Sequence, residues 1–135
     1  MSHLKRIRLE LARAAGSPEG EPNYGYEFVA PVDASDRLDT TTWGEVAQLC
    51  TMRRFAPNAD DVHGELIHRG PGEWAFSYSP GAADDEVIYR LGKHRLRAGE
   101  YVSVTEQDGV SRPFRIVSVD LMHVKPKRAG KSPAR

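Results

Sequence analysis

Along most of this chain, hydrophobic positions alternate with polar ones, which is the pattern of a β-strand that buries one face. The pattern is clearest from Gly99 to Val119, where two runs rich in Val, Ile, Tyr and Phe flank Gln107-Asp108-Gly109. Asp-Gly is a turn signal, because glycine takes the positive φ that most residues avoid. We predict a β-hairpin with a three-residue loop that pairs Val102 with Phe114, since a slip by one residue would mix charge into the apolar face. Its apolar face then consists of Val102, Val104, Phe114 and Ile116.

The same alternation predicts further short strands before this hairpin. They cover residues 4–13, 24–32, 64–69, 73–79 and 86–91, with a shorter segment at 94–97. Gly70-Pro71-Gly72 joins two of them into a second hairpin, and the polar segments 16–23, 58–61 and 80–85 are predicted loops. In the strand at 86–91 we expect Val87, Tyr89 and Leu91 to share one face.

One segment, from about Thr42 to Arg54, has helical periodicity instead. Trp43, Val46, Ala47 and Cys50 recur at positions i, i+3, i+4 and i+7, which predicts a helix with one buried stripe. Thr42 and Glu45 form a capping-box pattern at its start, and Pro57 lies just beyond its end.

These elements predict a mostly β (α+β) fold. Seven or eight short, closely connected strands favour a small antiparallel, partly open β-barrel, with the helix at 42–54 inserted after the second strand. A curved sheet packed on the helix is the alternative. Residues 1–124 should form a single domain, and the basic segment 125–135, which has no apolar pattern, is a predicted disordered tail.

Composition narrows the classes of function. The formal net charge of the 135 residues is zero, but basic residues concentrate near both ends and leave an acidic body between them. An acidic body argues against a nucleic-acid-binding domain, although the basic tail alone could attract phosphate. The apolar runs are too short to span a bilayer, the N-terminus lacks the apolar centre of a signal peptide, and a lone Cys50 allows no internal disulfide. We therefore expect a cytoplasmic protein without membrane segment or cofactor.

Several segments resemble a family of small uncharacterised proteobacterial proteins. The resemblance lies in RIRLELAR at the N-terminus, GYEFVAPVD (25–33), HGELIHRGPGEWAFSY (63–78) and HRLRAGEYVSVTEQDG (94–109). It spans most of the chain except the basic tail. The resemblance implies a self-standing domain, and it implies no catalytic residue, cofactor or partner.

Two rows of aromatic residues are the main candidates for a binding surface. They are Trp74, Phe76 and Tyr78 on one strand, and Tyr24, Tyr26 and Phe28 on another. Such rows fill the core of a small barrel, or they form an exposed platform for a protein or small ligand. On the second interpretation, Arg95 and Arg97 would supply charge at its rim. The predicted function is a binding or adaptor module that uses this aromatic surface or a sheet edge.

A small enzyme is the alternative, with a histidine–carboxylate site built from His63, His68 or His94 and an acidic loop. No local motif supports this, and His63 and His68, five positions apart on a strand, point to opposite faces. The acidic clusters at 60–61 and 84–86 are typical of solvated loops, and Cys50 is expected to be a buried small hydrophobe. We assign no catalytic or metal-binding residue. A weak nucleic-acid binder that uses the basic tail is a further alternative.

Overall fold

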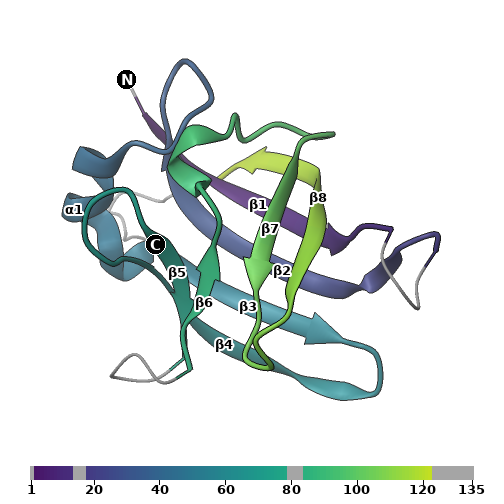
Figure 1. Cartoon of the computed structure of the whole chain (residues 1–135). Coiled ribbons are helices and arrows are strands. Elements are labelled where there is room, and N and C mark those ends of the chain that lie inside the picture. The colour runs from purple at the N-terminus through teal and green to yellow at the C-terminus, as the bar shows by residue number, and fades with distance from the viewer. Residues whose placement is uncertain (1, 14–17, 79–83, 123–135) are drawn as a thin grey trace, which may run out of the picture.

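Eight antiparallel strands close into a barrel in the computed structural model of this chain, which describes residues 2–13, 18–78 and 84–122 (Figure 1). The strands are β1 (His3–Leu11), β2 (Glu21–Val32), β3 (Thr51–Ala56), β4 (Ala59–His68), β5 (Trp74–Ser77), β6 (Glu86–Ile88), β7 (Tyr101–Thr105) and β8 (Ser111–Leu121). Each strand pairs with the next, and β8 returns to pair with β1. The predicted β-barrel is thus confirmed, and it is closed rather than partly open. The predicted tail at 125–135 lies outside the described residues.

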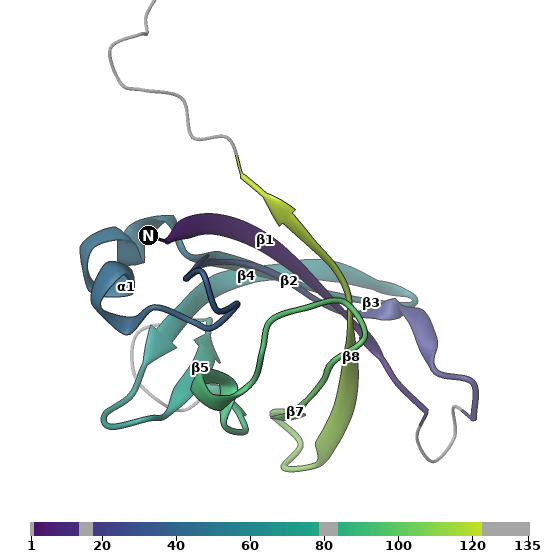
Figure 2. The ribbon, with the colours of Figure 1, turned by 90° about the horizontal axis from the view of Figure 1, so that it is seen from above.

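Short helices close one end of the barrel. α1 (Thr40–Val46) and the 3₁₀ turn η1 (Ala47–Leu49) lie between β2 and β3, and a second 3₁₀ turn, η2 (Leu91–Lys93), lies between β6 and β7. Both views place α1 on the far side of the barrel from the β3–β4 turn (Figures 1 and 2). Leu91 and Leu96 are fully buried, and Trp43 packs against the core. No helix in the described part of the chain is long and apolar enough to cross a membrane.

The predicted helix over 42–54 is wrong in its second half. α1 begins after Asp39, whose side chain accepts a hydrogen bond from the Thr42 amide, and it ends at Val46. Residues 51–56 form β3 instead, because pairing with β2 on one side and β4 on the other outweighs a local helical pattern. Met52 and Phe55, three residues apart, mimic helical spacing. In the barrel Met52 is buried in the core, whereas Phe55 is covered by the guanidinium of Arg8, 4.2 Å from its ring centre.

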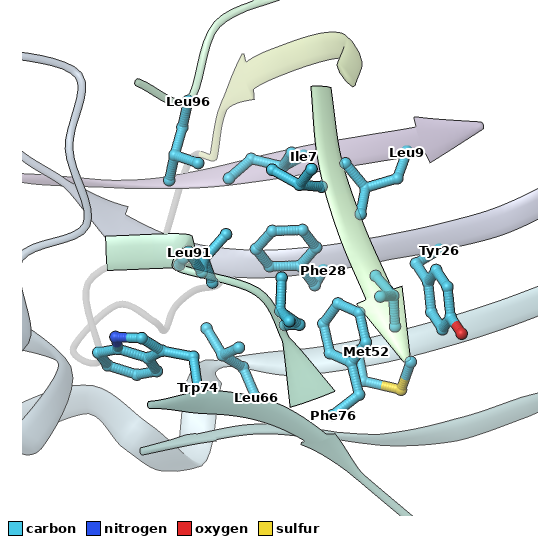
Figure 3. Close-up of a cluster of buried hydrophobic side chains, with 14 of the residues drawn as sticks. Ile7, Leu9, Tyr26, Phe28, Met52, Leu66, Trp74, Phe76, Leu91 and Leu96 are labelled. Atoms are coloured by element: carbon cyan, nitrogen blue, oxygen red, sulfur yellow. The ribbon is translucent and has the colours of Figure 1, made fainter. Parts of the chain in front are cut away.

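Aromatic rings fill the interior of the barrel (Figure 3). Tyr26 stacks on Phe76 with ring centres 4.7 Å apart, and Phe28 and Phe114 meet these rings edge-on. Trp74 lies at the end closed by η2, where it stacks on His68 at 4.4 Å. The two aromatic rows therefore supply the core, except for their outer members Tyr24 and Tyr78, which are only partly buried.

The hairpin at 99–119 has the predicted register. Val102 pairs with Phe114, the Glu106 amide bonds to the Val110 carbonyl, and Gly109 has φ = 81°. A three-residue loop, Gln107 to Gly109, is thus confirmed. The face predicted to be apolar is buried throughout.

Three other local predictions are wrong. The acidic segment at 60–61 belongs to β4, not to a loop, because the left-handed Asn58 (φ = 60°) completes the turn earlier. β6 ends at Ile88 with Glu86 and Ile88 inside, so Tyr89 is 57% exposed and does not share a buried face with Leu91. Residues 94–97 form no strand and connect η2 to β7.

Candidate functional site

A polar cluster occupies the mouth of the barrel at the end opposite α1. We define the mouth as the hollow bounded by the ends of β2 to β8 and by the β7–β8 loop, with a volume of about 300 Å³. Its lining consists of Tyr24, Arg54, Val62, Tyr78, Glu86, Glu106, Gln107, Asp108 and Arg112. Below it, Tyr26 and the packed aromatic rings fill the barrel. A ligand could therefore occupy the mouth but not the lumen.

Strand periodicity explains why polar groups converge here. Six of the nine lining side chains stand two residues from a buried apolar or aromatic residue, so they point to the same inner face of the sheet. The pairs are Tyr24 with Tyr26, Arg54 with Met52, Tyr78 with Phe76, Glu86 with Ile88, Glu106 with Val104, and Arg112 with Phe114. The inner face thus changes from apolar to polar at the same level on several strands.

Glu106 is the most heavily bonded group of the mouth. Glu106 is only 4% exposed, and its carboxylate lies 2.8 Å from Nη1 of Arg112 and 3.3 Å from Nη2 of Arg54. It also accepts hydrogen bonds from the hydroxyls of Tyr24 and Tyr26. Two guanidiniums and two hydroxyls therefore compensate the charge of this buried carboxylate.

Glu86 has a different environment, although it is only 1% exposed. Its Oε1 accepts from Tyr78 Oη at 2.5 Å and is 2.9 Å from Tyr26 Oη, while its Oε2 accepts from the Gln107 amide at 3.1 Å. All three neighbours are neutral. Among the described residues, no ion pair joins Glu86 to a cation. The predicted strand start at Glu86 is confirmed, but the prediction that the acidic cluster at 84–86 is solvated is wrong for Glu86, because strand β6 turns this residue inward.

Burial and the two carboxylates keep the mouth tyrosines protonated. Burial, followed by the hydrogen bond to Glu106, raises the pKa of Tyr24 to about 12. Burial also raises the pKa of Tyr26 and Tyr78 above that of a free phenol, and their carboxylate neighbours add to the effect. Their hydroxyls therefore stay protonated, as hydrogen-bond donors, to a higher pH than the hydroxyl of a free phenol. At the rim, the bond from Arg112 lowers the pKa of Asp108 to about 2.

The residues predicted from the sequence to bind a ligand are dispersed in the fold. Trp74 and Phe76 are buried in the core, and Tyr78 alone reaches the mouth. Arg97 forms an ion pair with Asp36 at 2.7 Å in the connection before β7, and Arg95 is in the same connection. The structure therefore does not bring these five residues together on one surface.

The three histidines of the enzyme hypothesis are also apart. His63 is exposed in β4, His68 stacks on Trp74 at the end of that strand, and His94 follows η2 with its Nε2 buried. No hydrogen bond or ion pair between described residues joins any of them to a carboxylate. The described residues also contain no group of three His, Cys, Asp or Glu side chains that could hold a metal ion.

Sequence reasoning missed Arg54, Glu86, Glu106 and Arg112 as members of one site. The available signal was the alternation itself, because a charged residue in phase with buried positions must either end the strand or face inward. Comparisons with protein-family models, with curated proteins and with solved structures each find no match to this chain.

Proposed function

We propose that this protein is a binding module whose ligand is a small polar molecule held in the mouth of the barrel. One observation carries the proposal: two carboxylates that are almost fully buried, Glu86 and Glu106, line a hollow that opens to solvent. Burying carboxylates costs free energy that an apolar pair would not cost, so stability alone gives no reason for them. Convergent polar groups around a concave surface are typical of ligand sites.

This proposal keeps the predicted binding module but moves its site. The aromatic rows mostly fill the core, and each of the eight described strands has partners on both sides, which argues against docking at a sheet edge. The cytoplasmic location, the proteobacterial family and the nucleic-acid-binding tail stay predictions.

Nuclear magnetic resonance tests the proposal directly. We expect a panel of small polar fragments, which includes amines, carboxylic acids, alcohols and amides, to shift the backbone amides of Gln107 and Asp108. The amide of Gly44 in α1, at the closed end, should not move. Failure of every fragment to shift the mouth amides would contradict the proposal.

A matched pair of variants locates the binding. Tyr78→Phe removes a donor to Glu86 at the mouth, whereas Tyr101→Phe removes a hydroxyl from the outer face of β7, where the residue is 56% exposed. We expect Tyr78→Phe to change the affinity for the fragments several-fold, because it removes a hydroxyl from the lining of the mouth and alters the hydrogen bonding of Glu86. Tyr101→Phe should leave it unchanged.

A further inference from the structure

The two sides of the mouth differ in charge balance. Both guanidiniums lie on the Glu106 side, where Arg112 also bonds to Asp108 at 2.8 Å. Glu86, on the other side, is hydrogen-bonded within the described residues to two tyrosine hydroxyls and one backbone amide, and to no cation. The lining residues thus contribute two positive side chains and three carboxylates.

The single hydroxyl hydrogen of Tyr26 also leaves Glu86 as the carboxylate with fewer hydrogen-bond donors. Tyr26 Oη is 2.5 Å from Glu106 and 2.9 Å from Glu86, but a phenol has one hydrogen and can donate to only one of them. When it donates to the nearer Glu106, Glu86 faces the lone pairs of the Tyr26 oxygen. Glu86 then lacks both an opposite charge and one hydrogen-bond donor. A ligand that brings both would remove the deficit.

On the basis of the proposed function, we propose that the mouth selects small organic cations, with a primary ammonium or guanidinium group directed to Glu86. Such a group supplies the missing charge and donates hydrogen bonds, and charge-assisted hydrogen bonds are the strongest polar contacts available to a small ligand. The aromatic wall suits the same class, because tyrosine rings attract cations over their faces. Arg54 already lies this way, 5.1 Å from the ring centre of Tyr24. An anion, by contrast, would have to displace Glu106 or Asp108 from the two arginines.

Three probes with the same carbon chain separate charge from shape. They are n-butylammonium, n-butanol and n-butyrate, each titrated against the full chain while the Gln107 and Asp108 amides are observed. We expect n-butylammonium to bind with a dissociation constant at least about tenfold lower than either other probe, because a charge-assisted hydrogen bond is roughly twice as strong as a neutral one and a tenfold change needs only about 1.4 kcal/mol. Calcium chloride at equal charge concentration should not reproduce its shifts.

Variants assign the preference to Glu86. Glu86→Gln keeps the size and the acceptor oxygen but removes the charge, so the preference for n-butylammonium over n-butanol should disappear. Asp61→Asn removes a carboxylate from the outer face, where Asp61 pairs with Arg53 at 2.8 Å, and should keep the preference. Circular dichroism melting shows whether each variant folds, and the three-probe series on the unaltered protein decides the question if Glu86→Gln does not.

Each result has one meaning. Equal or tighter binding of n-butyrate or n-butanol at the mouth would overturn the cation inference and leave the proposed function standing. A preference that survives in Glu86→Gln would overturn the role of Glu86, and equal shifts from calcium would overturn the organic class. Absence of mouth shifts with every probe and every fragment would overturn the proposed function as well.

Discussion

The hydroxyl of Tyr26 should stabilise the fold far more than its small size suggests. It lies within hydrogen-bond distance of both buried carboxylates, and its ring is fully buried between Phe76 and Phe114. Tyr26→Phe removes only the oxygen, so the ring packing stays and no large cavity forms. The variant therefore isolates the hydrogen bonds from the hydrophobic contribution.

The magnitude follows from the partners that remain. Glu86 keeps Tyr78 and the Gln107 amide, and Glu106 keeps Tyr24 and both arginines, so neither carboxylate is left without donors. One hydrogen bond to a charged group is lost outright, which costs about 1.5–3 kcal/mol. We expect the free energy of unfolding of Tyr26→Phe to fall by about 1.5–3 kcal/mol, the contribution of the one hydrogen bond that its hydroxyl can donate.

Urea denaturation measures this effect. The midpoint should move to lower urea while the slope stays that of the unaltered protein, because the surface exposed on unfolding hardly changes. Tyr101→Phe, on the exposed outer face, is the control and should lie within about 0.5 kcal/mol of the unaltered protein. A Tyr26→Phe variant as stable as this control would refute the view that the hydroxyl compensates the buried carboxylates.

Three further predictions concern packing and ionisation. Gly25→Ala should destabilise the barrel by about 1–3 kcal/mol in urea denaturation, because a Cβ there would lie 1.9 Å from the Leu9 carbonyl oxygen of β1. Gly44→Ala, in open space on α1, should be neutral or add up to about 1 kcal/mol, and equal effects at both sites would contradict the close approach. The Cys50 thiol is fully buried and burial raises its pKa to about 11, so Ellman's reagent should modify it only on unfolding, whereas rapid modification of the folded protein would show that it is accessible. The Tyr24 pKa of about 12 lies above the value of about 10 in an unfolded chain, so its contribution to stability is complete below pH 10 and is lost as the pH rises towards 12. Thermal melting should show this alkaline loss and a shallower pH dependence in Tyr24→Phe; an equally steep loss in that variant would assign it to other groups.

Local sequence was sufficient to predict strand pairing where two paired strands are joined directly by a short turn. The 99–119 hairpin could be placed in register from Asp108-Gly109 and the alternation around it, because a slip would have exposed an apolar face. The aromatic rows could be recognised as candidate core on the same ground. Neither inference depended on distant parts of the chain.

Local sequence failed to predict the conformation of segments whose state depends on strands that are distant in the sequence. Residues 51–56 satisfy a helical spacing, and only the neighbouring strands β2 and β4 make β3 the better state. The same holds for β6, since its short pairing with β5 and β7 determines that Glu86 rather than Tyr89 faces inward.

The sequence by itself therefore determined the class of fold, most of its strands and the register of the 99–119 hairpin, because the strand period and the turn residues are local properties. The tertiary structure alone decided that the barrel closes and that Arg54, Glu86, Glu106 and Arg112 meet. These residues come from strands β3, β6 and β8 and from the loop that follows β7, and their approach depends on the pairing of the whole circuit. The sequence shows that a charged residue such as Arg54 alternates in step with buried residues. Only the closure of the barrel determines which charged groups it meets and therefore where the polar site forms.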